Sequence, residues 1–395
     1  MCFMTKTLGT VSMGIRAPVI REGDDIVELV TDSLLTAVKE NKLKLQDNDI
    51  VSVTEAIVAR AQGNYASLDQ IAADVKGKFG DKTVGLVFPI LSRNRFALVL
   101  KGIARGVKKL VVQLSYPADE VGNHLVTLDM LDERGINPYT QSFTSDEFKK
   151  IFPEAKHIFT GVDYIEFYKA LGDNIEIVLS NDPCYILNHA KNIICADIHS
   201  RKRTAKLLTK AGAEKVCDLT NILNESVNGS GYQSDYGLLG SNFASSEKVK
   251  LFPRDGRGFA LALQENILKK TGKKLECMVY GDGAFKDPIG GIWELADPVV
   301  SPGFTKGLEG QPNEIKLKYV ADNDLANLNA KDATAEIKKM IAAKKKIEKT
   351  DAVALGTTPR RFVDLVGSLS DLTSGSGDKG TPIILIQNYF KNYAE

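Results

Sequence analysis

The feature that most constrains the fold is an alternation, between residues 82 and 230, of short apolar runs with helix-length stretches. The apolar runs include Val84–Leu91, Lys109–Leu114 and Ile175–Leu179. Parallel strands need a crossover of about a dozen or more residues between them, and that crossover is usually a helix. This region is therefore predicted to form α/β units with a parallel sheet covered by helices.

The composition is that of an ordinary folded globular protein, with 43% hydrophobic and 26% charged residues in a chain of 395. This length exceeds what one hydrophobic core usually organises, so we expect two domains or one elaborated domain. The chain has 51 Lys and Arg residues against 50 Asp and Glu residues, a formal net charge of +1. Because no overall field would hold nucleic acid or an anionic membrane, we expect neither as a partner.

The cysteines and the lack of long apolar segments predict a cytoplasmic protein. No apolar stretch approaches the roughly 20 residues that cross a bilayer, and the first residues show no secretory signal. The five cysteines are irregularly spaced, which is typical of reduced buried thiols. A zinc site at Cys184, His189, Cys195 and His199 would lack a CxxC pair, so buried thiols beside surface histidines are the favoured interpretation.

Outside the α/β region, several segments have a clear pattern. Residues Ile26–Asn41 have the apolar spacing of an amphipathic helix, and so does the lysine-rich segment Lys331–Lys349. Residues Asp49–Ala61 begin as a β-branched run and end at the turn signal Gln62-Gly63-Asn64, which predicts a strand leading into a functional loop.

The segment Leu275–Tyr280 is an apolar strand followed directly by Gly281-Asp282-Gly283. Glycines let the backbone turn, and the Asp282 carboxylate would stand at the end of the strand. Carboxylate oxygens are ligands that Mg²⁺ prefers, so Asp282 is the first metal candidate and Asp287 the second. Asp and Gly are also turn-forming residues, and the spacing alone favours neither interpretation.

Five segments, taken in chain order, match the pattern of one family. They are Ile15–Asp25, Asp49–Gly63, Gly240–Asp255, Val279–Phe285 and Phe362–Ile386. Together they resemble the coenzyme F420-0:gamma-glutamyl ligases, and their shared order is more specific than any one of them.

The resemblance implies an α+β fold, in which a ligase-like mixed α/β core carries an inserted α/β domain, and it implies a homodimer. The core would comprise residues 1–81, then 231–295 with the metal motif, and then 356–395 as a closing helix and strand. Residues 82–230 would be the inserted domain, and residues 296–355 a further insertion or helical extension.

The resemblance also implies an enzyme that joins L-glutamate to a carboxylate acceptor, with GTP or ATP and with Mg²⁺ or Mn²⁺. The acceptor would be a deazaflavin coenzyme, a folate-like molecule or an unknown carboxylate. A carboxylate is a poor electrophile, but its acyl phosphate can be attacked by an amine. Phosphoryl transfer of this kind needs positioning and nearby cations more than a covalent residue.

The nucleotide-binding residues implied by motif match are Pro18, Val19, Ile20, Thr54, Arg60 and Asn242. Arg60 takes the place of a lysine that contacts phosphate, and a guanidinium can bind phosphate through two donors. Asp282 would hold the metal, in a cleft with Asn242.

Two departures from the family pattern concern the metal. Ser246 stands where the family has a second metal aspartate, and Gly283 stands where a Thr or Ser follows the first. The second ligand is therefore either moved to Glu247, within reach of Asp282, or lost.

These departures motivate a second hypothesis, a non-catalytic nucleotide-binding, ligand-binding or regulatory protein on the same fold. A third hypothesis is an oxidoreductase or transferase that binds a dinucleotide in residues 82–230. It is disfavoured because no GxGxxG follows a strand there.

Overall fold

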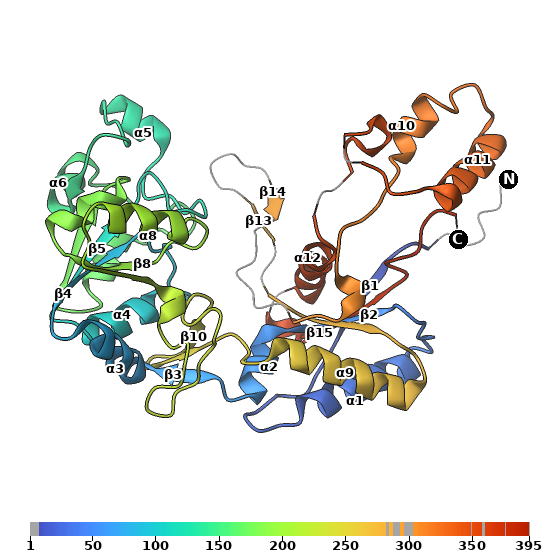
Figure 1. The fold of residues 1–395 in the computed structure, drawn as a ribbon, viewed down its shortest axis with the longest axis horizontal. Coiled ribbons are helices and arrows are strands. Elements are labelled where there is room, and N and C mark those ends of the chain that lie inside the picture. The colour runs from blue at the N-terminus through green and yellow to red at the C-terminus, as the bar shows by residue number, and fades with distance from the viewer. Residues whose placement is uncertain are drawn as a thin grey trace.

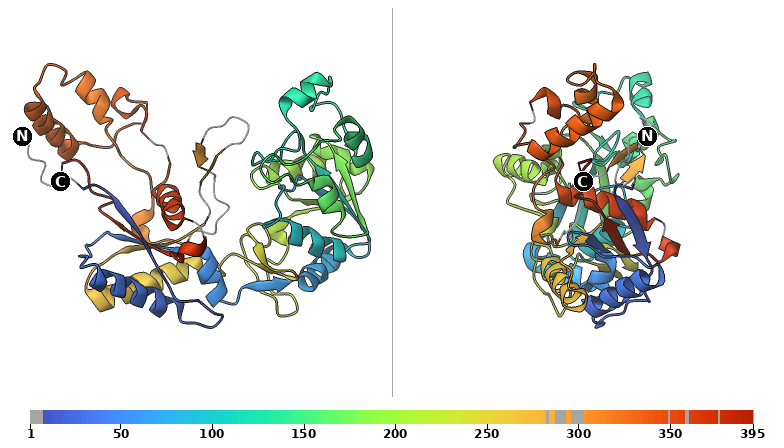
Figure 2. Two further views of the ribbon diagram at one scale, coloured as in Figure 1. Left: turned by 180° about the vertical axis from the view of Figure 1, so that it is seen from behind. Right: turned by 90° about the vertical axis from the view of Figure 1, so that its right-hand side faces the viewer.

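The computed structural model describes most of the chain. The described residues are 8–281, 284–286, 293–295, 303–348, 350–357, 360–375 and 377–394. They form two lobes, one around a six-stranded sheet and one around a four-stranded sheet (Figures 1 and 2). The α+β fold is confirmed.

The four-stranded lobe contains the sheet β1-β15-β2-β12, made by β1 (Val11–Ile15), β15 (Ile383–Gln387), β2 (Ile50–Thr54) and β12 (Glu276–Tyr280). Both faces of this sheet are covered, as Figure 1 shows. Helices α1 (Ile26–Glu40) and α9 (Gly256–Thr271) pack with Val51 and Val53 on one face. Helix α12 (Phe362–Ser374) packs with Ile50 on the other. Burial on both faces explains why both Ile50 and its neighbours Val51 and Val53 in β2 are apolar.

The six-stranded lobe contains the sheet β6-β7-β5-β4-β8-β9. Its strands are β4 (Thr83–Val87), β5 (Lys109–Leu114), β6 (Phe143–Thr144), β7 (Ile175–Leu179), β8 (Asn192–Cys195) and β9 (Lys215–Asp218). All the pairings are parallel except that of β6 with β7. The parallel sheet predicted from the apolar runs is confirmed.

The helices of this lobe are α3 (Leu68–Phe79), α4 (Ala97–Arg105), α5 (Leu128–Glu133), α6 (Ser145–Ile151), α7 (Tyr164–Lys169) and α8 (Arg201–Lys210). One apolar cluster includes α3, α4 and much of the sheet. The same cluster takes in Ala66 and Leu251, so the packing extends beyond residues 82 and 230 at both ends. The predicted domain limits remain a prediction.

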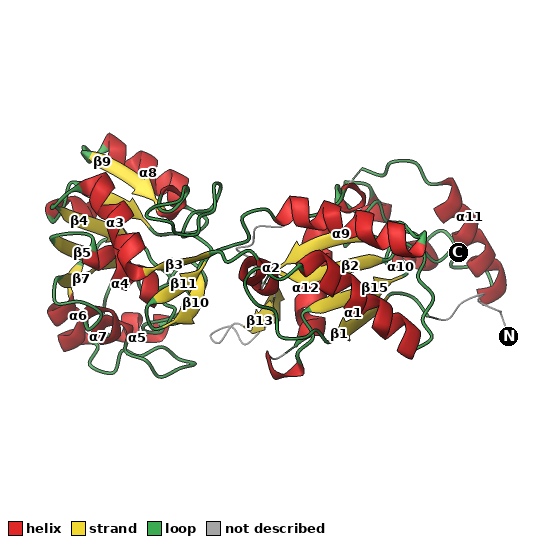
Figure 3. Ribbon diagram, turned by 90° about the horizontal axis from the view of Figure 1, so that it is seen from below, coloured by secondary structure: helices red, strands yellow, loops and turns green. Residues whose placement is uncertain are grey.

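A small antiparallel sheet, β10-β11-β3, lies where the two lobes join (Figure 3). It consists of β10 (Asn242–Ser245), β11 (Lys248–Lys250) and β3 (Tyr65–Ser67). Helix α2 (Glu55–Ala61) connects the end of β2 to the start of β3. The remaining hairpin and helices are β13 (Ala284–Lys286), β14 (Trp293–Leu295), α10 (Leu317–Asp322) and α11 (Ala330–Ala343).

The predicted helices at residues 26–41 and 331–349 correspond to α1 and α11. Helix α11 is shorter than predicted, because it ends at Ala343 and the chain is extended at Lys344. No helix in the described part of the chain is both long and apolar enough to cross a bilayer.

Candidate active site

One edge of the four-stranded sheet brings together chain segments that are far apart in sequence. Strands β2 and β12 run parallel, with Thr54 beside Tyr280 at their carboxyl ends. Strand β15 is antiparallel to β2 and to β1, so its first residue, Ile383, lies beside Ile15 at the end of β1. The chain therefore leaves β1, β2 and β12 at the same edge, which is the usual position of ligand-binding loops.

Four of the predicted nucleotide-binding residues lie at or close to this edge. Thr54 is the last residue of β2, and Pro18, Val19 and Ile20 follow β1. Ile20 is buried at 3% exposure, whereas the Val19 side chain is 79% exposed. Of the three residues after β1, Pro18 and Val19 are therefore open to a ligand and Ile20 is not, while Thr54 is partly exposed.

Pro18 lines a groove of about 1090 Å³ between α1, β1 and the segment before β15. The groove is mainly apolar, and its charged lining is mixed: Arg16 and Lys379 are cationic, and Asp32 and Glu40 are anionic. A groove of this size, lined mainly by apolar atoms, could hold a small organic ligand.

Cationic side chains meet at the junction of the lobes, close to the end of β2. Asn242, at the start of β10, pairs with Lys250, at the end of β11. The backbone N–H of Phe243 donates to the carbonyl of Asn94 at 2.8 Å, which places the loop before α4 beside this pair. Arg95 is the next residue of that loop.

The charged groups of this region shift the pKa values of their neighbours. Burial lowers the pKa of Lys250, Glu55 raises it, and Arg60 and Arg95 lower it further. Burial also lowers the pKa of Arg95, and the carboxylates of Glu55 and Asp371 oppose that shift. We refer to Arg60, Arg95 and Lys250 as the cationic cluster.

Of the three predicted metal ligands, the structure describes Glu247 alone. Asp282 and Asp287 lie outside the described residues, so the expected proximity of Asp282 to Asn242 and Glu247 remains a prediction. Glu247 is in the β10–β11 turn, at the opposite end of the hairpin from Asn242. Its carboxylate lies 3.2 Å from Lys101 Nζ and 2.8 Å from an Arg105 nitrogen, and these bonds lower its pKa.

Among the residues that the structure describes, no group of three or more His, Cys, Asp or Glu side chains could hold a metal ion. This includes the zinc alternative with Cys184, His189, Cys195 and His199. Burial raises the pKa of the Cys195 thiol, which keeps it protonated rather than ready to bind a metal.

The comparison with protein families shows to which family the chain belongs. A model of the F420-0:gamma-glutamyl ligase family matches residues 14–388, which is nearly the whole chain. The chain belongs to this family. No curated protein matches the sequence. Membership in the F420-0:gamma-glutamyl ligase family supports an enzyme with gamma-glutamyl ligase activity, as the resemblance implied.

Three charged residues of this candidate site were not selected from the sequence: Glu55, Arg95 and Lys250. Glu55 directly follows a predicted buried strand, and a carboxylate in that position is a signal that could have been used. Arg95 and Lys250 come close only through the pairing of β10 with β11 and the contact of Asn94 with Phe243. Neither interaction has a local sequence signal.

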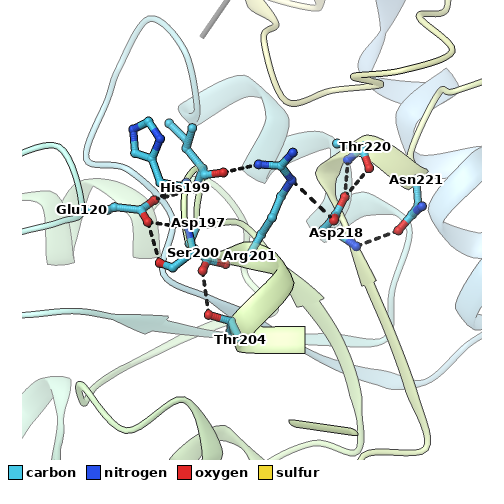
Figure 4. Close-up of polar contacts among 10 residues, drawn as sticks. Glu120, Asp197, His199, Ser200, Arg201, Thr204, Asp218, Thr220 and Asn221 are labelled. Atoms are coloured by element: carbon cyan, nitrogen blue, oxygen red, sulfur yellow. Dashed lines mark hydrogen bonds and ion pairs between the residues drawn. The ribbon is translucent and has the colours of Figure 1, made fainter. Parts of the chain in front are cut away.

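A second polar arrangement in the ligase lies at the start of α8, at the carboxyl edge of the six-stranded sheet (Figure 4). The Glu120 carboxylate accepts hydrogen bonds from the backbone N–H groups of Ile198, His199 and Ser200 at 2.6, 2.9 and 2.7 Å. It also accepts a hydrogen bond from the Ser200 hydroxyl at 2.5 Å. Helix N-termini often bind phosphate, but this one is occupied by a carboxylate of the chain itself. This arrangement gives no support to the dinucleotide hypothesis.

We expect Glu120→Ala to lower the free energy of unfolding by about 1 kcal/mol at pH 7. The effect is no larger because solvent screening reduces what these hydrogen bonds contribute to stability. Burial raises the pKa of Glu120, but the bonds from Ser200, His199 and Ile198 lower it overall from 4.5. A lowered folded-state pKa stabilises the fold above the unfolded pKa, and that stability is lost as the pH falls. The difference from the parent should therefore shrink below about pH 4.5.

Urea unfolding of both proteins between pH 3 and 8 measures this difference. Both proteins contain the buried carboxyl of Asp197, so most of the pH dependence that Asp197 contributes cancels in the difference between their free energies of unfolding. Asp81→Ala removes an exposed carboxylate and is the matched control, for which we expect a change within about 0.5 kcal/mol. A Glu120→Ala effect that does not depend on pH would show that the carboxylate charge is unimportant at α8.

Proposed function

We propose that this ligase adds L-glutamate to a carboxylate acceptor through an acyl phosphate, with GTP or ATP and with Mg²⁺ or Mn²⁺. The observation that carries the proposal is the family match over residues 14–388. The position of the cationic cluster beside the end of β2 supports it, because phosphoryl transfer needs positive charge around the transferred group. The acceptor is a deazaflavin coenzyme, a folate-like molecule or another small carboxylate.

The reaction would proceed in two steps. An oxygen of the acceptor carboxylate attacks the γ-phosphorus, and the nucleoside diphosphate leaves. The amine of L-glutamate then attacks the acyl carbon, inorganic phosphate leaves, and an amide bond remains. In both steps the cations offset negative charge on the phosphoryl oxygens, while Asn242 and Thr54 would orient the nucleotide.

A metal bound by Asp282, with Asp287 or Glu247, would supply further positive charge beside the phosphates. Glu247 would have to exchange its bonds with Lys101 and Arg105 for such a role. We also propose a cytoplasmic homodimer, which is supported only by the composition and the family resemblance.

The second candidate function is a non-catalytic nucleotide-binding or regulatory protein. Ser246 and Gly283 favour it, and so does the engagement of Glu247 by two cations. This candidate predicts ligand binding without turnover.

Phosphate release separates the two candidates. The protein is incubated with GTP or ATP, Mg²⁺ or Mn²⁺, L-glutamate and a panel of deazaflavin, folate and pterin carboxylates. For a ligase we expect release that requires both glutamate and one class of acceptor, and that stops when EDTA removes the metal. Binding of nucleotide or acceptor without release across the whole panel would favour the non-catalytic protein.

A further inference from the structure

The groove between α1 and β1 has two distinct ends. Helix α1 lies beside β1 (Figure 3). The Lys44 carbonyl, shortly after α1, accepts a hydrogen bond from the side chain of Gln387 at 3.0 Å, and Gln387 pairs with Val11 at the start of β1. At the other end, the Ala17 N–H donates to the Gly380 carbonyl at 3.3 Å. Helix α1 therefore ends near the start of β1, and the segment before β15 meets the chain as it leaves β1.

The charged residues of the groove lining are divided between these ends. Arg16 and Lys379 belong to the end at which the chain leaves β1. Glu40, the last residue of α1, belongs to the opposite end. Asp32 lies midway along α1, and its carboxylate is 3.0 Å from Lys270 Nζ, so a cation of the chain itself already offsets its charge. The groove therefore offers positive charge to a ligand at the end beside the ligase site.

Of the three substrates in the proposed reaction, the carboxylate acceptor fits this groove best. The volume of about 1090 Å³ is at the upper end of the range for small-molecule sites, roughly 300 to 1,000 Å³, and is larger than L-glutamate alone would need. A nucleoside triphosphate carries several negative charges, which a mainly apolar lining that includes Glu40 would not offset. A deazaflavin, folate-like or pterin-like acceptor combines a flat aromatic ring with a carboxylate. Apolar side chains can cover such a ring, and a cation can bind the carboxylate.

We propose that the groove between α1 and β1 is the acceptor site of the ligase. The aromatic ring of the acceptor lies against apolar side chains such as Leu29 and Leu43, and its carboxylate lies toward Arg16 and Lys379. This inference rests on the proposed function. The cationic end of the groove is at the sheet edge where the chain leaves β1, β2 and β12, so the carboxylate would face the loops that are proposed to hold the nucleotide.

Calorimetric titration of the full-length protein tests the proposal, with folic acid, pterin-6-carboxylic acid and a deazaflavin carboxylate as probes. Thr36 is exposed on α1 and lines the groove, so Thr36→Trp fills the groove without changing the core. We expect it to weaken binding of the probe that the parent binds by about 10-fold or more, and to leave the affinities for Mg²⁺–GTP and Mg²⁺–ATP unchanged. Lys39→Trp is the matched control, because Lys39 is exposed on the same helix outside the groove lining. It should change neither affinity.

The cationic end of the groove is tested with the bound probe and with its amide derivative, which lacks the carboxylate charge. Arg16→Gln and Lys379→Gln should each weaken binding of the acid by about 5- to 10-fold and leave binding of the amide unchanged. Lys42→Gln removes an exposed cation outside the groove lining and is the matched control, for which we expect no change. These variants replace Thr36→Trp as the test if that variant does not fold.

Parental affinity of folded Thr36→Trp for the probe would overturn the acceptor site and leave the ligase assignment standing. Weaker nucleotide binding with unchanged probe binding would also overturn it, because the groove would then hold the nucleotide. Equal losses for the acid and the amide in Arg16→Gln and Lys379→Gln would show that these cations have a structural role and would overturn the placement of the carboxylate. A parent protein that binds none of the probes would overturn the acceptor classes of the proposed function as well.

Discussion

Asp282→Asn is expected to slow glutamate-dependent nucleotide hydrolysis by about a hundredfold or more, with little change in the thermal midpoint. In the sequence, Asp282 comes two residues after Tyr280, the last residue of β12, which lies beside Thr54 at the end of β2. An asparagine keeps the size of the side chain but removes its negative charge. The cation that offsets charge in phosphoryl transfer would then be held less tightly. Steady-state phosphate release with the identified acceptor measures the effect.

Asp324→Asn is the control for this experiment, because Asp324 is an exposed carboxylate near the end of α10. We expect it to leave the rate unchanged. Raising the Mn²⁺ concentration should recover part of the activity of Asp282→Asn, since weaker metal binding is overcome by mass action. A parental rate in Asp282→Asn would exclude this residue from the metal site.

Asn64→Ala is expected to lower the free energy of unfolding by about 3 kcal/mol. Asn64 is fully buried where the chain passes from α2 to β3. Its amide nitrogen donates to the carbonyls of Tyr232 and Phe252 at 2.9 and 2.6 Å, and its side-chain oxygen accepts the Tyr232 N–H at 3.0 Å. Alanine would leave these backbone groups without their partner in a buried position.

Urea unfolding of Asn64→Ala and of Asn41→Ala gives the comparison. Asn41 is exposed and its amide makes a bond to Ala37 O at the end of α1, so about 0.5 kcal/mol is expected. Because the Asn64 bonds hold the segments on either side of the small sheet, the unfolding midpoint of the whole protein should fall. Equal effects of the two variants would show that the junction does not depend on the buried amide.

The features of the fold that were predictable are those encoded locally. Strand β2 and helix α1 have apolar patterns whose period matches their structure, and the parallel strands β4, β5 and β7 coincide with the predicted apolar runs. The end of helix α11 was not predictable from the pattern. Its apolar spacing continues to Ile347, but the helix stops before the lysine run that begins at Lys344.

The features that were not predictable depend on contacts between distant segments. Strand β3 pairs with β11, so that Tyr65 lies beside Lys250, and no sequence period signals such a pairing. The loop that carries Arg95 comes to lie beside Asn242 in the same way, through the bond between Asn94 and Phe243. The family resemblance implied Asn242 as a nucleotide-binding residue, but it gave no indication that a loop of the six-stranded lobe lies beside it.

Product mass tests the central claim most directly. The full-length protein is incubated with L-glutamate, GTP or ATP, Mg²⁺ or Mn²⁺ and each acceptor, and the acceptor is then analysed by mass spectrometry. A ligase is expected to increase the mass of one acceptor class by a glutamyl unit, and only when nucleotide and metal are both present. Tight binding of an acceptor with no such increase, under every nucleotide and metal combination, would contradict the assignment of ligase activity.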